Sequence, residues 1–280
     1  MEKIKEALAK AKLSIDKIKP QNNQSSILTA KPTVAQSVVN ENQTDISRIE
    51  YQNTPVVNLN ATHLEKNRIV TYNSTDAING VFDLLRTQVL RIMEENNWRT
   101  MAIVSPTPAS GKTFTAINLA ISISKQPTKT AMLVDFDLRR PRVASYLGLK
   151  VEKSLNDYLD GHAEIDQIIV NPGIAKLVVI PTLRGTKKSA EQIGSSKVRN
   201  LINEVATRYH SRIVIFDLPP VLSADDALVM MPMVDCVLLV VANGMSTKAE
   251  IEDTLRHIPK EKLLGIVMNK AEVQANDYYY

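Results

Sequence analysis

Six short apolar runs, rich in valine, isoleucine and leucine, recur along the chain after residue 99. They are Met101–Val104, Thr130–Val134, Leu177–Ile180, Arg212–Phe216, Cys236–Val241 and Leu263–Met268. Their length and their β-branched composition predict strands. Because the runs are apolar almost throughout, without alternation, both faces of each strand are expected to be buried. That pattern is typical of a parallel sheet covered by helices.

Helical patterns separate these runs. The predicted helices are Lys112–Ser124, Ser189–Arg208, Ala224–Met231 and Lys248–His257, with one more, Ile78–Met93, before the first strand. In the predicted helix Ile78–Met93 the apolar residues recur at a spacing of three and four, which places them on one face. The predicted fold class is therefore α/β, a mainly parallel sheet with helices on both faces, in one domain from residue 75 to residue 270.

The N-terminal part has a different pattern. Residues 1–19 predict a basic amphipathic helix, because the apolar positions Ile4, Ala7, Leu8, Ala11, Ile15 and Ile18 form one stripe and lysines occupy the other faces. Such a helix can lie on anionic lipid, dock into a partner's groove or simply be solvated. Residues 20–74 are rich in Gln, Asn, Ser and Thr and predict a flexible linker.

Composition and charge narrow the possible functions. The formal net charge is +4, and residues 1–19 alone hold six lysines against three acidic residues. The rest of the chain is nearly neutral, so nucleic acid is not an expected partner. A single cysteine, Cys236, excludes internal disulfides and is expected in the core. Without an apolar run long enough for a membrane or a secretory signal, the predicted location is the cytoplasm, peripherally at the inner face of the plasma membrane.

The strongest chemical signal follows the first predicted strand. The sequence from Ser105 to Thr113 ends in Gly-Lys-Thr and opens a helix, which is the context of a phosphate-binding loop of P-loop NTPase type. Backbone N–H groups of such a loop point at phosphates, the lysine reaches the terminal phosphates and the threonine hydroxyl can ligate Mg²⁺. The predicted nucleotide-binding residues here are Pro108, Ala109, Ser110, Gly111, Lys112, Thr113 and Phe114.

Three aspartates follow two other strands. Asp135 and Asp137 end the second predicted strand, and Asp217 ends the fourth in the sequence Asp-Leu-Pro-Pro. Because parallel strands bring their carboxyl ends to one edge, these carboxylates are expected beside the phosphate loop. Carboxylates there can bind Mg²⁺ or accept a proton from an attacking hydroxyl. The combination predicts a nucleotide–magnesium site.

Together, Ser105–Thr113, Leu133–Arg142 and Ile213–Asp226 resemble the bacterial tyrosine autokinases of capsule and exopolysaccharide synthesis. Members of that family carry a Walker A loop, a Walker A′ of the form Asp-x-Asp-x-Arg, a Walker B ending in Asp-x-Pro-Pro and a C-terminal tyrosine cluster. This chain ends in a tail, residues 271–280, that carries Tyr278, Tyr279 and Tyr280.

The resemblance implies a role for each motif. ATP and Mg²⁺ would be bound by Lys112 and Thr113, with Asp137 and Asp217 organising the metal. Asp135 would orient or deprotonate the incoming tyrosine, and Asn269 would contact adenine. The phosphoacceptors would be the three terminal tyrosines, phosphorylated in trans by another copy.

The resemblance also implies partners and one departure. The expected partners are a separate membrane-bound polysaccharide co-polymerase that activates the kinase and a cognate tyrosine phosphatase, with polymerisation and export of the polysaccharide as the regulated process. Members of the family usually carry Glu-x-x-Arg-x-x-Arg on the helix before the first strand, a motif used in ring assembly. The matching positions here are Gly80, Asp83 and Arg86, so only the last residue is kept.

Two other functions fit the nucleotide site. One is a switch ATPase similar to the partitioning and division-site ATPases, which carry an additional lysine near the start of the phosphate loop. Residues 100–111 contain no lysine, which argues against that class. The other is an adaptor that binds nucleotide without transferring phosphate.

Overall fold

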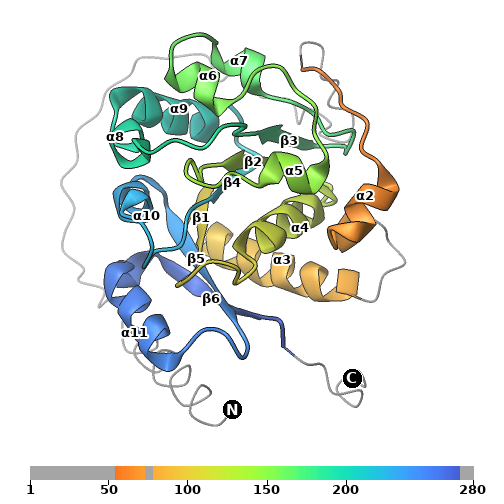
Figure 1. Cartoon of the computed structure of the whole chain (residues 1–280). Helices are drawn as coiled ribbons and strands as arrows, with labels where there is room; N and C mark the ends of the chain where they lie inside the picture. The colour runs from red at the N-terminus through yellow and green to blue at the C-terminus, as the bar shows by residue number, and fades with distance from the viewer. Residues whose placement is uncertain (1–53, 73–77, 272–280) are drawn as a thin grey trace, which may run out of the picture. The chain divides into compact units, whose positions relative to one another are not determined.

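The computed structural model describes residues 54–72 and 78–271. The predicted helix over residues 1–19, most of the predicted linker and the tyrosine-bearing tail lie outside the described residues. Figure 1 shows the described part as a central sheet between layers of helices.

The sheet has six strands in the order β3-β2-β4-β1-β5-β6, and every neighbouring pair is parallel. The strands are β1 (Thr100–Val104), β2 (Thr130–Asp135), β3 (Leu177–Ile180), β4 (Arg212–Asp217), β5 (Cys236–Ala242) and β6 (Leu263–Asn269). All six predicted strands are confirmed, as is the parallel α/β fold. Since β2 and β4 are neighbours and pair Asp135 with Asp217, the predicted acidic strand ends lie side by side.

Alternate residues of each strand enter two separate cores, as the uninterrupted apolar runs require. In β1, Met101 and Ile103 face one core, and Ala102 and Val104 face the other. The first core is closed by α2 (Ala61–Lys66), α3 (Ile78–Glu95), α4 (Lys112–Ser124) and α5 (Val143–Leu147). The second is closed by α6 (Leu155–Leu159), α7 (Ile165–Ile168), α8 (Ser189–Ile193), α9 (Ser196–Thr207), α10 (Asp226–Met230) and α11 (Lys248–His257). The predicted helices on both faces are confirmed.

Two helix predictions need correction. The single helix predicted over Ser189–Arg208 is wrong, because the chain breaks at Gly194 and the Ser195 side chain accepts a hydrogen bond from the Val198 N–H, which starts α9 as a new helix. The helix predicted over Ala224–Met231 is shorter and continues as the 3₁₀ turn η3 (Met231–Met233). The short helices α5, α6 and α7 and the turn η4 (Lys260–Lys262) were not predicted.

The linker predicted over residues 20–74 is wrong where the structure describes it. Residues 54–72, which we call the strap, contain α2 and the 3₁₀ turn η2 (Val70–Tyr72). The strap begins beside β3, where Val56 forms a parallel bridge with Asn171. It then crosses to α4, and its Leu64 and Ile69 are 1% and 2% exposed in the core. The polar composition suggested that the entropic cost of ordering this segment would keep it flexible. Burial of these two apolar side chains offsets that cost.

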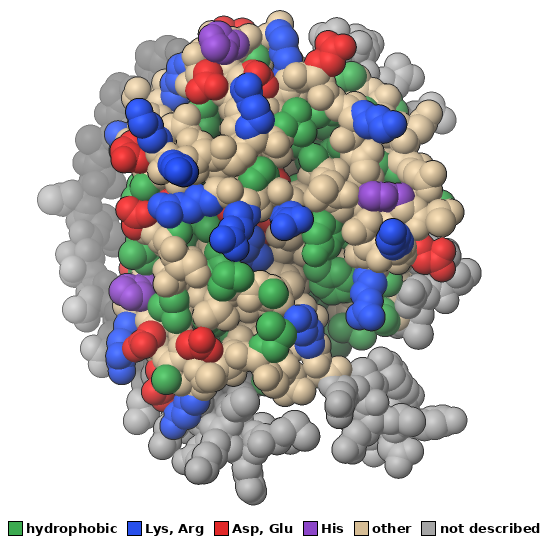
Figure 2. Space-filling view, in the orientation of Figure 1, with side chains coloured by type: hydrophobic (Ala, Val, Ile, Leu, Met, Phe, Trp, Pro, Cys, Tyr) green, Lys and Arg blue, Asp and Glu red, His purple; other side chains and the backbone are tan. Residues whose placement is uncertain are grey.

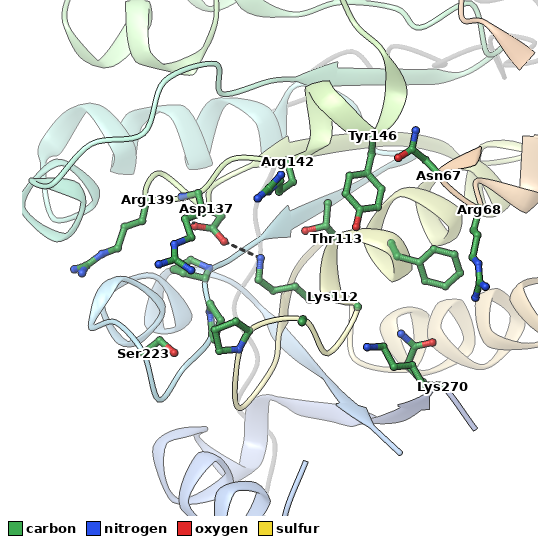
Figure 3. Close-up of a pocket in the computed structure, with 18 of the residues that line it drawn as sticks. Asn67, Arg68, Lys112, Thr113, Asp137, Arg139, Arg142, Tyr146, Ser223 and Lys270 are labelled. Atoms are coloured by element: carbon green, nitrogen blue, oxygen red, sulfur yellow. Dashed lines mark hydrogen bonds and ion pairs between the residues drawn. The ribbon is translucent and has the colours of Figure 1, made fainter. Parts of the chain in front are cut away.

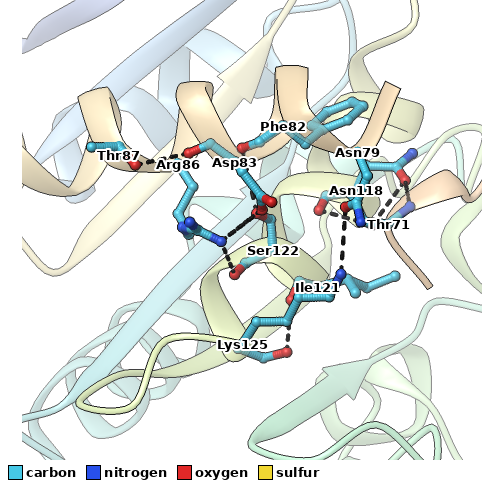
Figure 4. Close-up of polar contacts among 11 residues, drawn as sticks. Thr71, Asn79, Phe82, Asp83, Arg86, Thr87, Asn118, Ile121, Ser122 and Lys125 are labelled. Atoms are coloured by element: carbon cyan, nitrogen blue, oxygen red, sulfur yellow. Dashed lines mark hydrogen bonds and ion pairs between the residues drawn. The ribbon is translucent and has the colours of Figure 1, made fainter. Parts of the chain in front are cut away.

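A buried asparagine fastens the strap to α4. The Asn118 side-chain oxygen accepts hydrogen bonds from the N–H and the hydroxyl of Thr71, at 3.1 and 2.9 Å. Its amide nitrogen donates to the carbonyls of Arg68 and Phe114, at 3.3 and 3.0 Å. Figure 4 shows Thr71 and Asn118 next to each other beneath α3. The end of the strap is therefore held on the helix that follows the phosphate loop.

Two smaller observations complete the fold. Cys236 is fully buried, as predicted for a core residue. No helix in the described ranges combines the length and the apolar character needed to cross a bilayer.

Candidate functional site

The phosphate loop connects β1 to α4 and is shaped by left-handed backbone. Gly111 is the N-cap of α4 with φ 94°, and Ala109 has φ 63°. Glycine adopts such positive φ values with little strain, whereas in alanine they cost conformational energy. In the described part of the chain, no hydrogen bond uses the backbone N–H groups of Gly111, Lys112 or Thr113. These groups are available to an anion at the N-terminus of a thirteen-residue helix.

The side chains of α4's first residues meet the acidic strand ends. Lys112 Nζ donates to Asp137 Oδ2 at 2.8 Å and lies 3.6 Å from Asp217 Oδ1. The Thr113 hydroxyl donates to Asp217 Oδ2 at 2.6 Å. All four residues are less than a tenth exposed. The residues predicted for metal and phosphate chemistry are thus brought together, and Figure 3 shows three of them, Lys112, Thr113 and Asp137.

Burial and mutual charge shift the pKa values of this cluster. Burial alone lowers the pKa of Lys112, but the charges of Asp217 and Asp137 outweigh it and hold the pKa above its ordinary value. Burial raises the pKa of Asp217 although Lys112 and Thr113 oppose the shift. Asp137 and Asp217 outnumber the single ammonium of Lys112, so with both carboxylates ionised the cluster has an excess of negative charge, which a bound cation would relieve.

Asp135 is placed differently from the expectation that it meets an incoming hydroxyl. It is fully buried beneath the loop, and it is absent from the described residues that line the cavity above the site. Its Oδ2 accepts from the N–H groups of Arg142 and Val143 at 3.0 and 2.9 Å, and its Oδ1 accepts from the Asp137 N–H at 3.3 Å. Asp135 thereby holds the turn from Asp137 to the start of α5. Burial, with the nearby charge of Asp217, raises the pKa of Asp135 to about 8.

A cavity of about 1000 Å³ opens above the phosphate loop. Seven lysines and arginines line it against a single acidic residue, Asp137. The basic side chains are Lys66, Arg68, Lys112, Arg139, Arg140, Arg142 and Lys270. Figure 2 shows Lys and Arg side chains gathered in the middle of this face. A cavity of this size and charge suits a polyanionic ligand.

The residues present fit a nucleotide with Mg²⁺. Asp217 Oδ1 is buried without a hydrogen-bond partner among the described residues, so it can ligate a cation. No group of three or more His, Cys, Asp or Glu side chains in the described ranges is arranged to enclose a metal ion. Magnesium in phosphate sites needs only one or two carboxylates, because phosphate oxygens and waters complete its octahedron. Thr113, Asp137 and Asp217 would hold it.

Asn269 and the ring-assembly positions adopt specific intramolecular contacts. Asn269 ends β6, lines the cavity and donates from Nδ2 to the Ser110 carbonyl at 3.0 Å, so it packs directly on the phosphate loop.

Arg86 donates to Asp83 at 2.7 Å and to the Ser122 hydroxyl at 3.1 Å. Figure 4 shows both side chains turned toward α4. In this arrangement Asp83 and Arg86 join two helices of the same chain.

The residues that form one wall of the cavity were not predicted from the sequence. Lys66, Asn67 and Arg68 come from the strap, and Tyr146 comes from α5. The Asn60 N-cap, whose side chain accepts from the His63 N–H at 3.0 Å, is the signal that could have revealed α2. Arg139 is fixed by Asp226, which accepts from its guanidinium at 2.9 Å, and this contact ties the turn after Asp137 to α10.

Comparison with known proteins assigns the chain. A family described as an AAA domain matches residues 98–263, more than half of the 280 residues. The chain belongs to this family. Within this AAA domain lie β1, the phosphate loop and all three aspartates.

The relatives of this AAA domain chain include curated tyrosine-protein kinases, which confirms the resemblance to bacterial tyrosine kinases. The tyrosine-protein kinase ptk of Acinetobacter johnsonii is 24% identical over 248 residues, 88% of this chain and 32% of the relative. The tyrosine-protein kinase YwqD of Bacillus subtilis is 28% identical over 197 residues, 70% of this chain and 82% of the relative. The chain thus spans about a third of the first relative and most of the second.

Solved structures support the same assignment. The kinase domain of the Escherichia coli tyrosine kinase ETK superposes with a TM-score of 0.67 at 27% identity, covering 76% of this chain and 84% of that domain. The P-loop α/β fold of this AAA domain is therefore that of a bacterial tyrosine-kinase domain.

Proposed function

We propose that the protein is an ATP-dependent protein-tyrosine kinase that phosphorylates its own C-terminal tyrosines. The observation that carries the proposal is the buried contact of Lys112 and Thr113 with Asp137 and Asp217 at the floor of a basic cavity. The similarity to proteins named tyrosine-protein kinases supports the choice of tyrosine as acceptor.

Each residue of the cluster has a separate role in this proposal. Lys112 would neutralise the terminal phosphates, and the free N–H groups of Gly111 to Thr113 would hold the other phosphate oxygens. Bound Mg²⁺ would supply charge neutralisation across the phosphates. Asp137 is the only carboxylate on the cavity surface among the described residues, so it would face the phosphates and help to hold Mg²⁺ there. Asp135 would act through the turn that it holds.

The acceptors and partners follow from the family resemblance. Tyr278, Tyr279 and Tyr280 would be presented in trans to a neighbouring copy, and a cognate phosphatase would remove the phosphates. A membrane-bound co-polymerase would activate the kinase from outside this chain and bring it to the inner face of the plasma membrane. Each phosphate adds about 1.5 to 2 negative charges at neutral pH, which provides a signal to polysaccharide synthesis.

The decisive experiment incubates the purified chain with ATP and Mg²⁺ and measures phosphotyrosine and ATP hydrolysis in parallel. Three samples are compared with the wild type: Lys112→Ala, a chain ending at Asp277, and the wild type with the cytosolic part of a candidate activator. We expect phosphotyrosine in the wild type, increased by the activator, and none in Lys112→Ala or in the shortened chain.

Three outcomes would redirect the assignment. Hydrolysis of ATP without phosphotyrosine under every condition would identify a switch ATPase. Phosphotyrosine that persists in the chain ending at Asp277 would remove the terminal tyrosines as the main acceptors. Binding of ATP with neither hydrolysis nor transfer would leave the adaptor function.

A further inference from the structure

The cavity extends in two directions from the phosphate loop. Asp137, Arg139 and Ser223 lie on one side of Lys112 and Thr113, and Asn67, Arg68 and Lys270 lie on the other (Figure 3). Phosphate loops hold the terminal phosphates near the lysine and the metal carboxylates. A nucleotide placed in this way directs its sugar and base away from Asp137, into the half of the cavity bounded by the strap.

Arg68 is placed in that half with its guanidinium uncommitted. It lines the cavity and is exposed, and its guanidinium makes no hydrogen bond or ion pair with the rest of the described chain. Phe114 lines the same cavity, and its half-buried ring is fixed by an edge-to-face contact with Phe82 at 5.6 Å. A planar cation and an aromatic ring that line one cavity are both groups on which a flat heteroaromatic ring can stack.

The backbone of Arg68 is held relative to the phosphate loop. Its carbonyl accepts from the buried Asn118 amide at 3.3 Å, and Asn118 lies on α4, the helix that begins with Lys112. Arg68 has φ 57°, a left-handed conformation that the strap maintains. The distance between the phosphate loop and the backbone of Arg68 is therefore fixed by the fold.

We propose that Arg68 is a nucleobase-binding residue, whose guanidinium stacks on the purine ring of the bound nucleotide. The inference rests on the nucleotide site proposed above and adds to it the base contact from the strap. The binding energy from Arg68 depends on the base, whereas that from Lys112 depends on the phosphates.

The test measures the dissociation constants of Mg²⁺–ATP and of Mg²⁺–tripolyphosphate, which lacks the base, by titration calorimetry. The variants are Arg68→Ala, Arg68→Lys, which keeps the charge and loses the planar group, and Arg91→Ala. Arg91 is exposed on α3 and does not line the cavity, so it controls for the loss of one positive charge. Thermal unfolding of each variant verifies that the fold is retained.

We expect both Arg68 variants to bind ATP about fivefold more weakly than the wild type, equivalent to about 1 kcal/mol, with tripolyphosphate binding unchanged. Arg91→Ala should behave as the wild type. Full binding of ATP by Arg68→Lys, or an equal loss with tripolyphosphate, would show a simple charge effect and overturn the proposal. A wild type that binds both ligands equally would also overturn it, whereas a wild type that binds neither would instead refute the nucleotide site itself.

Discussion

Replacement of Asn118 by alanine tests whether the strap is an integral part of the fold. The side chain has no exposed surface and makes four hydrogen bonds, two with Thr71 and one each with the carbonyls of Arg68 and Phe114. Alanine removes all four and leaves the N–H of the fully buried Thr71 without this partner.

The expected cost follows from these contacts. A buried donor left unpaired costs about 1–3 kcal/mol, and each further hydrogen bond contributes about 1 kcal/mol net. The Thr71 hydroxyl keeps one acceptor, the Asn118 carbonyl at 3.2 Å, which limits the loss. We therefore expect Asn118→Ala to lower the free energy of unfolding by about 3 kcal/mol. Thr71→Val, which keeps the backbone N–H bonded, should cost about 1 kcal/mol.

Urea denaturation followed by circular dichroism measures the effect. With a slope of about 3 kcal/mol per molar urea, Asn118→Ala should shift the midpoint by about 1 M. The matched control is Asn96→Ala. Asn96 is exposed, and among the described residues its side-chain amide donates only to the Ile92 carbonyl near the end of α3, at 2.8 Å, so its loss should cost about 0.5 kcal/mol. An Asn118→Ala midpoint equal to that of Asn96→Ala would refute the conclusion that this residue fastens the strap.

Three other predictions concern single residues. The folded protein holds a proton on Asp135 up to about pH 8, whereas the unfolded chain releases it near pH 4. The free energy of unfolding should therefore fall as pH rises between these values, by up to about 1.4 kcal/mol per pH unit. Asp135→Asn should flatten this slope in urea unfolding at several pH values, leaving the part due to Asp217, and an unchanged slope would contradict the assignment. Gly111→Ala should abolish ATP binding in calorimetry, because a Cβ there meets the Asn269 amide and the φ of 94° is strained for alanine; retained affinity would argue against the loop geometry. Burial raises the pKa of the Cys236 thiol, so a thiol reagent should label it only after urea is added, and rapid labelling of the native protein would show an open core.

The parts that the sequence predicted correctly are those dictated by local pattern. Apolar runs such as Cys236–Val241 are stable as strands buried on both faces in a sheet covered by helices. The Gly-Lys-Thr sequence has a defined local geometry at the start of a helix. Once the strands were known to be parallel, Asp137 and Asp217 had to meet at the phosphate loop.

The parts that local pattern missed depend on tertiary contacts. The strap is polar in composition, and its place is decided by Leu64, Ile69 and the distant Asn118. The depth of Asp135 could not be read from the spacing of two aspartates either. Which of the two reaches the cavity depends on the turn that follows, where the Arg142 and Val143 N–H groups draw Asp135 inward.

The two edges of the sheet are finished differently, and this affects how the protein can aggregate. Beside β3, Val179 is bridged by Val170, and the adjoining Asn171 is bridged by Val56 of the strap. At the other edge β6 pairs only with β5 among the described residues, and its seven residues carry no charge. Uncharged edge strands are templates for pairing between molecules, and flanking lysines such as Lys260 and Lys270 oppose it. When salt screens those lysines, intermolecular association is expected to begin at β6 and to spare the edge that the strap protects.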